Sequence, residues 1–345
     1  LHPDERFLSM VLASISPVEK TGEYFNTELS SLNPANRGYG FFVYGTLPIY
    51  IIRYLGEWLG QTGYDAITIL GRYVSAIFDL LTVLLVFLIG KKLYSKRVGL
   101  IAACFYALAV LPIQLSHFMT VDTLTNTFGM LTIYIGAWIA TRGTHNGRSI
   151  STAQNEGIEP KPRFSAREWL PYLLFGISLG MATASKINAV SLAFFLVFIK
   201  LVQYLQTEKS RRNQKLFFIT WELLIAGVAS FITFRIFQPY AFNGPGFLNF
   251  GINTQWWSSM QSLSAQAAGE VDFPPALQWA RRPITFAWTN MVQWGMGLPL
   301  GILSWLAFLG MGWAIFKKKQ LQNLPIWLWA IAYFLWQGLA WVRSM

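Results

Sequence analysis

Two adjacent carboxylates near the start of the chain could serve as a general base. Asp4 and Glu5 lie in the stretch His2-Pro3-Asp4-Glu5, directly ahead of a long apolar sequence that is rich in tryptophan. Because a charged group beside lipid is costly, such residues are candidates for function by default. A carboxylate at a membrane surface could deprotonate an acceptor hydroxyl, and two together could bind a divalent ion.

Four other polar residues interrupt apolar segments: Arg72, His117, Asp122 and Lys186. The arginine and the lysine could neutralise a phosphate leaving group, and Asp122 adds a second acidic position. Each residue also has a simpler interpretation. Arg72 could extend to the interface, and Asp122 could cap a helix. Lys186 could end a helical hairpin, and His117 could be a hydrogen-bonded turn residue.

Composition places these residues in a membrane protein. Hydrophobic residues make up 54% of the chain and charged residues only 12%, whereas roughly a quarter of the residues in a soluble domain are charged. Windows of about 20 residues are almost free of charge, which is the length that a helix needs to cross the hydrocarbon. Continuous apolar runs such as Leu80 to Ile89 favour helices over a barrel, whose strands would alternate. We therefore expect an all-α polytopic membrane protein.

Eight membrane-spanning helices are predicted, and they set the domain organisation. Residues 1–66 form an outer loop, and residues 67–345 form a transmembrane bundle with a cytoplasmic loop at 141–168 and an outer loop at 239–296. The chain begins without Met and ends directly after a span, so we expect it to be a fragment of a longer protein. The predicted spans are 67–90, 98–116, 119–140, 169–185, 187–204, 216–238, 297–316 and 325–343.

Basic residues orient these helices. Four connections hold 17 of the 27 Lys and Arg residues and fall on one side if the spans alternate: 91–97, 142–167, 200–215 and 317–319. The positive-inside rule makes that side cytoplasmic, so the candidate residues named above face out. The net charge of +11 is then mainly topological. It predicts contact with anionic membrane lipids and argues against a nucleic-acid partner.

Two outer segments are predicted to lie along the membrane surface. Residues 41–60 are apolar but contain Arg53 and Glu57, which favours an interfacial helix over a span. The outer loop 239–296 contains several tryptophans, a density typical of the lipid headgroup zone. The expected anchors of the first segment are Tyr44, Tyr50, Tyr54 and Trp58.

Metal and disulfide chemistry has few ligands in this sequence. The single cysteine, Cys104, lies inside a predicted span, where we expect it to pack in the core. It excludes an intrachain disulfide and a Cys-based zinc site, and three histidines are too few for a His-rich cluster. Asp4 and Asp122 would be the ligands of a divalent cation if one is needed, with Glu270 and Asp272 as weaker candidates.

Four segments together resemble a known family. Taken in order, they resemble the lipid-carrier-dependent glycosyltransferases of family 39, in the branch of the GT-C fold that contains protein O-mannosyltransferases and aminoarabinose transferases. The resemblance runs to Asn188, and beyond that point it is general. The segments are His2-Pro3-Asp4-Glu5, Gly71-Arg72-Tyr73-Val74-Ser75-Ala76 leading to Gly90-Lys91-Lys92-Leu93-Tyr94, Ser116-His117-Phe118-Met119-Thr120-Val121-Asp122-Thr123, and Ala182-Thr183-Ala184-Ser185-Lys186-Ile187-Asn188.

The resemblance implies a fold and a reaction. The fold would be a GT-C-type helical bundle with interfacial helices in a first outer loop that carries the catalytic Asp-Glu pair. The reaction would transfer a sugar, with inversion, from a polyprenyl-phosphate donor to a protein, lipid or glycan acceptor. It would take place on the outer face of a bacterial or archaeal-type cell membrane.

The resemblance also implies roles for individual residues. Asp4 would be the general base that activates the acceptor hydroxyl, and Glu5 would orient Asp4 or the acceptor. Arg72 and Lys186 would bind the departing lipid phosphate. Asp122 would support the acceptor or a metal ion. His117 would lend further support from the neighbouring turn.

Two alternatives from other classes stay open. A transporter or flippase of a lipid-linked sugar would use the same charges along a transport path. It would be favoured if Asp79, which we otherwise interpret as a structural polar contact, lined a central cavity with Asp122. A purely structural membrane scaffold would leave Asp4 and Lys186 apart and unpaired.

Overall fold

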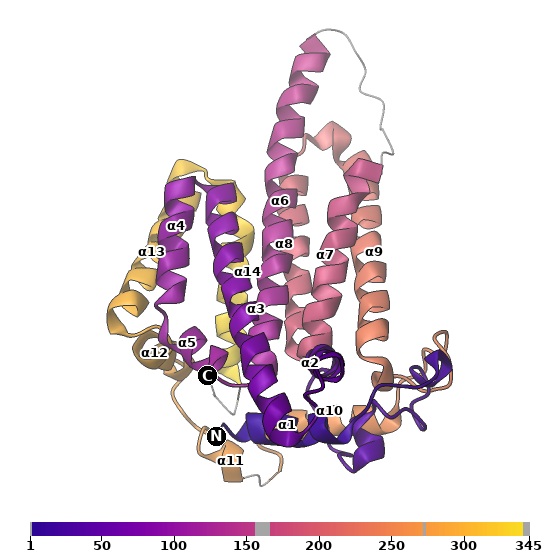
Figure 1. The fold of residues 1–345 in the computed structure, drawn as a ribbon. Helices are drawn as coiled ribbons and strands as arrows, with labels where there is room; N and C mark the ends of the chain where they lie inside the picture. The colour runs from indigo at the N-terminus through magenta and orange to yellow at the C-terminus, as the bar shows by residue number, and fades with distance from the viewer. Residues whose placement is uncertain (1, 156–165, 272–273, 341–345) are drawn as a thin grey trace.

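The computed structural model describes residues 2–155, 166–271 and 274–340, and in these ranges long helices run side by side while shorter ones lie across one end (Figure 1). Short 3₁₀ segments lead into three of the long helices: Ile187–Leu192 (η3), Lys209–Arg211 and Leu321–Asn323. The long helices are α3 (Tyr64–Leu93), α4 (Lys96–Ala107), α6 (Val121–Asn155), α7 (Ala166–Ser185), α8 (Ala193–Leu205), α9 (Arg212–Phe237), α13 (Leu298–Lys318) and α14 (Leu324–Leu339).

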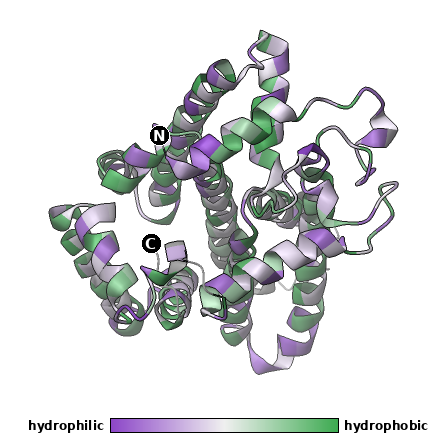
Figure 2. Cartoon of the chain, turned by 90° about the horizontal axis from the view of Figure 1, so that it is seen from below, coloured by the Kyte–Doolittle hydropathy of each residue, from purple (hydrophilic) through white to green (hydrophobic). Residues whose placement is uncertain are grey.

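The remaining helices form what we call the end layer. Viewed from this end, they cross the ends of the long helices and carry both hydrophilic and hydrophobic residues (Figure 2). Phe242 and Ile252 form an isolated antiparallel β-bridge. The layer contains α1 (Pro3–Ser14), α2 (Thr46–Leu59), α5 (Val110–Ser116), α10 (Thr254–Ala268), α11 (Pro274–Leu277) and α12 (Phe286–Asn290), with 3₁₀ turns at Thr21–Glu23, Pro34–Arg37 and Pro239–Ala241 and a π-helical turn at Met291–Gly295.

The basic connections lie at the opposite end of the bundle from the end layer. The α3–α4 turn, the end of α6 with the start of α7, the α8–α9 connection and the α13–α14 turn all lie at the upper end in Figure 1. This grouping agrees with the topology that the positive-inside rule predicts. The charged candidates of the sequence analysis therefore belong to the end that carries α1.

Each predicted span corresponds to one helix or to two consecutive ones. Among the described residues, four helices are long and apolar enough to cross a membrane, and α4 with α5, bent by 62°, add a fifth if they form one span. The total of eight spans stays a prediction. Helix α6 continues to Asn155, so the first part of the predicted loop 141–168 is helical, and its residues 156–165 lie outside the described ranges.

The outer surface of the long helices is apolar. Large side chains such as Leu80, Phe194 and Leu309 are exposed on it, as expected where lipid replaces water around a protein. Cys104 on α4 is also exposed. Its expected core packing is therefore wrong, because this part of α4 faces away from the neighbouring helices.

Helix α2 lies across the end of the bundle and packs against α1, α3 and α7 (Figure 1). Its apolar stripe belongs to the core beneath the layer: Leu47, Ile49 and Ile52 are buried. Tyr50 is buried with them, so its expected role as a lipid anchor is wrong. Trp58, at the far end of the helix, is exposed.

The loop between α1 and α2 is tied to residues that come much later in the chain. Tyr24 Oη donates a hydrogen bond to Ile236 O at 2.7 Å, and Thr27 Oγ1 donates to Phe242 O at 2.7 Å. Arg235, at the end of α9, is fully buried and donates to the carbonyl oxygens of Phe247, Pro239 and Gly246. The bonds of Tyr24 and Thr27 therefore join the α1–α2 loop to the segment around the end of α9.

Candidate active site

Asp4 and Glu5 occupy the first turn of α1, and the helix gives them different surroundings. The His2 side chain caps the helix by accepting a hydrogen bond from Asp4 N. Glu5 shares a helix face with Leu8 and Leu12, three and seven positions later, and all three are buried. Asp4 is offset by about 100° around the helix and stays partly exposed.

Glu5 forms a bidentate ion pair with Arg72 of α3. Nε and Nη2 of Arg72 donate to its two oxygens at 2.7 and 2.8 Å, and Met119 N donates to Oε1 at 3.0 Å. Burial alone would raise the pKa of Glu5, but the hydrogen bonds from Arg72 and Met119 and the Arg72 charge lower it below its ordinary value. Glu5 is therefore an ionised anchor and a poor proton acceptor.

A glycine allows α3 to approach the turn that precedes α6. A Cβ atom on Gly71 would lie 2.1 Å from Met119 Cγ, so any side chain at this position would displace the turn. Since Arg72 follows Gly71 directly, the glycine brings both partners of Glu5 together. Phe118 completes this corner, with its ring centroid 6.0 Å from the guanidinium carbon of Arg72.

Asp122 and Lys186 form a second ion pair. Asp122 lies in the first turn of α6, Lys186 lies between α7 and η3, and Nζ of Lys186 donates to Asp122 Oδ1 at 2.7 Å. Burial would lower the pKa of Lys186, but the charge of Asp122 and the hydrogen bond to it raise the pKa above its ordinary value, with a smaller contribution from Asp4. Lys186 is therefore a cation at neutral pH.

Asp4 joins this second pair through Tyr44. Burial raises the pKa of the Tyr44 phenol, and the charge of Asp4, a side-chain hydrogen bond to Asp4 and the charge of Asp122 raise it further. Asp4, Tyr44, Asp122 and Lys186 are thus one electrostatic cluster. Asp4 forms no ion pair with any residue that the structure describes. Its carboxylate is the one available for a substrate proton.

A second glycine brings Tyr44 next to Lys186. Gly45 N donates to Ser185 O at 3.1 Å, and a Cβ atom on Gly45 would lie 2.0 Å from Ala184 O. Only glycine allows the start of α2 to lie this close to the end of α7. Tyr44 and Lys186 are the residues adjacent to this contact, and both side chains feel the charges of Asp4 and Asp122.

Two other charged candidates lie outside this cluster. His117 ends α5, where its Nδ1 is 2.6 Å from Ile113 O, so it fits the simpler interpretation as a turn residue. Asp79 accepts a hydrogen bond from Tyr106 Oη at 2.9 Å and so joins α3 to α4. Asp122 pairs with Lys186.

The carboxylates do not assemble a metal site within the described ranges, where no group of three or more His, Cys, Asp and Glu residues could hold an ion. Asp4 and Asp122 supply two carboxylates, and an ion bound to them would take its remaining oxygen ligands from water or substrate. Glu270 is exposed at the end of α10, and Asp272 lies outside the described residues.

Two members of the site were missed from the sequence. Tyr44 was interpreted as a lipid anchor, although its position directly before Gly45 gives it a place beside the acids. The Met119 contribution comes from a backbone N–H, which no side-chain pattern could indicate. Gly71 itself was the available signal, since a glycine inside an apolar helix often marks a close approach.

Comparison with known proteins gives one family match. The model of the family described as dolichyl-phosphate-mannose-protein mannosyltransferase matches residues 54–238, more than half of the chain. That segment includes Arg72, Asp122 and Lys186. No curated protein matches the sequence.

Solved structures show a similar fold. The Archaeoglobus fulgidus oligosaccharyltransferase tethered with an acceptor peptide is 16% identical, with a TM-score of 0.61 over 98% of this chain and 46% of that one. The same organism's enzyme in complex with an inhibitory peptide and a dolichol-phosphate is 15% identical, with a TM-score of 0.56 over 98% of this chain and 47% of that one. The Saccharomyces cerevisiae protein O-mannosyltransferase Pmt1-Pmt2 complex bound to the sugar donor is 18% identical, with a TM-score of 0.45 over 70% of this chain and 31% of that one. The chain therefore spans less than half the length of each.

Proposed function

Because the chain belongs to the dolichyl-phosphate-mannose-protein mannosyltransferase family, we propose that it transfers mannose from a dolichyl or other polyprenyl phosphate to a hydroxyl group of a protein. The family match confirms the resemblance drawn from the four motifs, and the structural likeness confirms the all-helical GT-C fold. The observation that carries the proposal is the cluster in which Asp4, which has no ion pair among the described residues, lies near the cation Lys186.

Asp4 is the general base of the proposed reaction. Its carboxylate accepts the proton of the acceptor hydroxyl while the hydroxyl oxygen forms a bond to the anomeric carbon of the sugar. The bond between that carbon and the phosphate oxygen breaks, and the lipid phosphate leaves with the bonding electrons. Attack opposite the leaving group inverts the anomeric centre.

Lys186 and Arg72 stabilise the phosphate as it leaves. An ammonium group has three donors and a guanidinium group has five, so each side chain keeps N–H groups beyond those bound to Asp122 and Glu5. Both side chains are partly exposed, which leaves these donors accessible to phosphate oxygens. Charge-assisted bonds of this kind grow stronger as negative charge develops on the leaving group.

Glu5 is a positioning residue in this scheme. Its two oxygens bind Arg72 and Met119 N, and its lowered pKa keeps it ionised. It therefore orients the phosphate-binding guanidinium, whereas the resemblance implied that it orients Asp4 or the acceptor. Asp122 does the same for Lys186.

We place the reaction on the outer face of the membrane. The proposal is supported by the position of the cluster in the end layer, opposite the basic connections that the positive-inside rule assigns to the cytoplasm (Figure 1). Exposure of the layer to an aqueous compartment gives a protein acceptor direct access to Asp4.

The test is transfer by the full-length protein. The protein is reconstituted in lipid vesicles with polyprenyl-phosphate mannose and peptides that contain Ser or Thr, and the peptides are analysed by mass spectrometry. The expected product is a peptide heavier by one hexose, and polyprenyl-phosphate glucose reports on sugar choice. Movement of the donor between leaflets without any glycosylated peptide would favour the transporter instead.

A further inference from the structure

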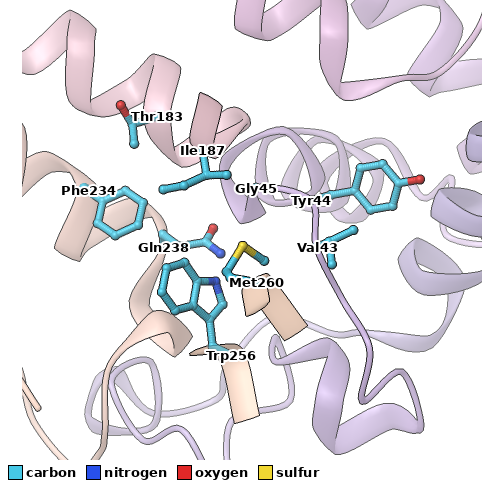
Figure 3. A pocket seen from close by; sticks show the side chains of 9 residues that line it. All are labelled: Val43, Tyr44, Gly45, Thr183, Ile187, Phe234, Gln238, Trp256 and Met260. Carbon is cyan, nitrogen blue, oxygen red and sulfur yellow. The ribbon is translucent and has the colours of Figure 1, made fainter. Parts of the chain in front are cut away.

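The end layer contains a small pocket that the proposed reaction does not use. It lies where the segment before α2 meets α7, α9 and α10, and its lining includes Val43, Gln238, Trp256 and Met260 (Figure 3). The pocket has room for about one water molecule, and its lining among the described residues is uncharged. A lipid headgroup or a sugar is too large for it. The opposite end of the bundle presents an open, charged surface instead.

Two turns at the basic end form a strongly cationic surface. Four basic residues flank the α3–α4 turn and three end α13, and all seven are exposed. Both turns lie at the upper end of the bundle in Figure 1, far from α1 and Asp4. We call this surface the basic patch, and it consists of Lys91, Lys92, Lys96, Arg97, Lys317, Lys318 and Lys319.

A hydrogen bond joins the two turns. Tyr94, which lies between Lys92 and Lys96 in the chain, donates from Oη to Asn323 Oδ1 at 2.9 Å. Asn323 is buried, and its Nδ2 donates to Gln320 Oε1 at 3.4 Å, so both ends of its amide are held. The bond keeps the cations of the two turns together on one part of the surface.

The basic patch has no acidic residues to offset its charge. The sequence contains no Asp or Glu in 80–121 or in 273–345, the segments that hold the patch. None of the seven cations forms an ion pair with any residue that the structure describes. Like charges on adjacent turns repel one another, so anions bound from the surroundings would stabilise the folded protein.

Membrane orientation accounts for basic residues at this end but not for the absence of acids. Acidic residues contribute little to the positive-inside rule, so orientation alone would tolerate them. The other two basic connections do contain them, since Glu208 lies between α8 and α9 and Glu156 precedes α7 in the sequence. Lys96 and Arg97 also stand in the first turn of α4, where the helix dipole disfavours cations. Neither orientation nor helix stability therefore explains the patch.

The surroundings of the patch favour a lipid over an acidic protein as its ligand. Large apolar side chains begin within two turns of the cations: Trp313 and Phe316 on α13 and Val98 and Ile101 on α4 are exposed. Nζ of Lys318 lies over the Trp313 ring, 4.8 Å from its centroid. Tryptophan beside lysine is typical of the lipid headgroup zone. A ligand that carries an anionic group directly above apolar chains matches both parts of this surface.

We propose that the basic patch is a binding site for an anionic phospholipid of the adjacent leaflet, whose phosphate bridges the α3–α4 and α13–α14 turns. The phosphate oxygens accept hydrogen bonds from basic side chains of both turns, and the acyl chains lie along the exposed apolar faces of α4 and α13. Binding relieves the repulsion between the turns and so stabilises the contact of Tyr94 with Asn323. The site is separate from the proposed sugar transfer, which takes place at the other end of the bundle.

The experiment removes one cation from each turn of the full-length protein. Lys96→Gln/Lys317→Gln lowers the charge of the patch by two, and the control Lys209→Gln/Lys215→Gln lowers the net charge equally at the α8–α9 connection. Native mass spectrometry during titration with phosphatidylglycerol or phosphatidylcholine gives the dissociation constant of each bound lipid. The tightest phosphatidylglycerol site should weaken roughly 10- to 30-fold in the patch variant and stay unchanged in the control.

Thermal unfolding gives a second readout. Phosphatidylglycerol should raise the unfolding temperature of the wild-type protein more than phosphatidylcholine does, and this difference should shrink in Lys96→Gln/Lys317→Gln. Lys96→Arg/Lys317→Arg keeps both charges and should keep the tight binding and the stabilisation. Raising the salt concentration should weaken phosphatidylglycerol binding, because it screens exposed charges.

Three results would overturn the lipid site. Equal affinity of the wild-type protein for the two lipids would remove the preference for an anionic headgroup. Equal weakening in the patch variant and the control would leave only a general attraction to the basic end. Binding of a polyglutamate peptide at the patch, without preference for phosphatidylglycerol, would assign the surface to an acidic protein instead.

Discussion

Two ion-pair clusters lie at opposite ends of the bundle, and they differ in access to their surroundings. At the basic end, Lys200 of α8 lies 2.8 Å from Glu222 of α9, and Nζ donates to Tyr172 Oη of α7 at 2.6 Å. The Lys200 side chain is 2% exposed. In the end layer, the side chains of Arg72 and Lys186 are 40% and 44% exposed although each is paired with an acid.

This difference in side-chain exposure distinguishes a cluster that stabilises the fold from one that can bind a ligand. The Lys200 cluster joins three helices and is closed to any ligand, so its charges serve packing. The Lys186 cluster keeps free N–H groups facing the surroundings, and next to it stands Asp4, which has no ion pair in the described part of the chain. An ion pair in an apolar protein therefore does not by itself mark a site, whereas a partly exposed one beside an unpaired acid does.

The strongest test of the comparison is Asp4→Asn. Removing a general base should lower the rate of mannose transfer by roughly 10²- to 10⁴-fold, while donor binding is retained because Arg72 and Lys186 are unchanged. Transfer kinetics on the full-length protein measure this. Asp65→Asn, in the exposed first turn of α3, is the matched control, and full turnover in Asp4→Asn would reject the base assignment.

At the opposite end, Lys200→Met should affect stability and not catalysis. It leaves Glu222, whose side chain is only 15% exposed, without its cation, which should lower the free energy of unfolding by about 3–5 kcal/mol, while the KM values for donor and peptide stay the same. Thermal unfolding in detergent measures the loss, and exposed Lys209→Met should show none. Adding Glu222→Leu to Lys200→Met should recover much of the stability. A change in donor affinity would show that the two ends are coupled.

Lys186→Ala should produce the reverse pattern, with an effect on donor binding and little effect on stability. A hydrogen bond to a charged group contributes about 1.5–3 kcal/mol, which corresponds to a donor KM raised by roughly 10- to 150-fold. Arg72→Ala should weaken donor binding too, and it should also destabilise the protein because Glu5 then stays buried without its partner. Unchanged donor affinity in both variants would remove the phosphate-binding role.

The smallest expected effect is a pH dependence of stability that Glu5 causes. Its pKa is lower in the folded protein than its ordinary value of 4.5, so its contribution is complete above about pH 4.5 and is lost as the pH falls through the folded-state pKa. Unfolding temperatures measured between neutral and acidic pH should fall in this acidic range. Glu5→Gln should lower the unfolding temperature at neutral pH and flatten the acidic slope, whereas an unchanged slope would contradict the buried ion pair.

The fold could be predicted in large part because lipid imposes a simple rule on sequence. A helix must satisfy its own backbone, so apolar runs such as those of α3 and α13 show their positions directly. The basic connections likewise indicated which ends lie together. Helix α2 was predicted to lie along the surface, but the burial of Tyr50 depends on α1 and α7, which no local pattern reveals.

The site could be predicted as a set of residues but not as a set of partners. Topology placed Asp4, Glu5, Arg72, Asp122 and Lys186 in one region. The structure divides them into two ion pairs and one acid that has no ion pair in the described ranges. That division depends on side-chain directions: Glu5 faces the core with Leu8, and Asp4 does not. Helical periodicity contained this information, because the two residues differ by one position around α1.

The bonds that join the two parts of the end layer also set an order for biosynthesis. Tyr24 and Thr27 bind partners 212 and 215 positions later in the chain. During synthesis, the segment that carries Asp4 therefore lacks these two hydrogen bonds until α3 to α9 have been made and inserted. Ile236 and Phe242 must therefore reach the same side of the membrane as α1 before these hydrogen bonds can form. A nascent chain shorter than this has its acid but no finished site, and activity begins only after most of the bundle is in place.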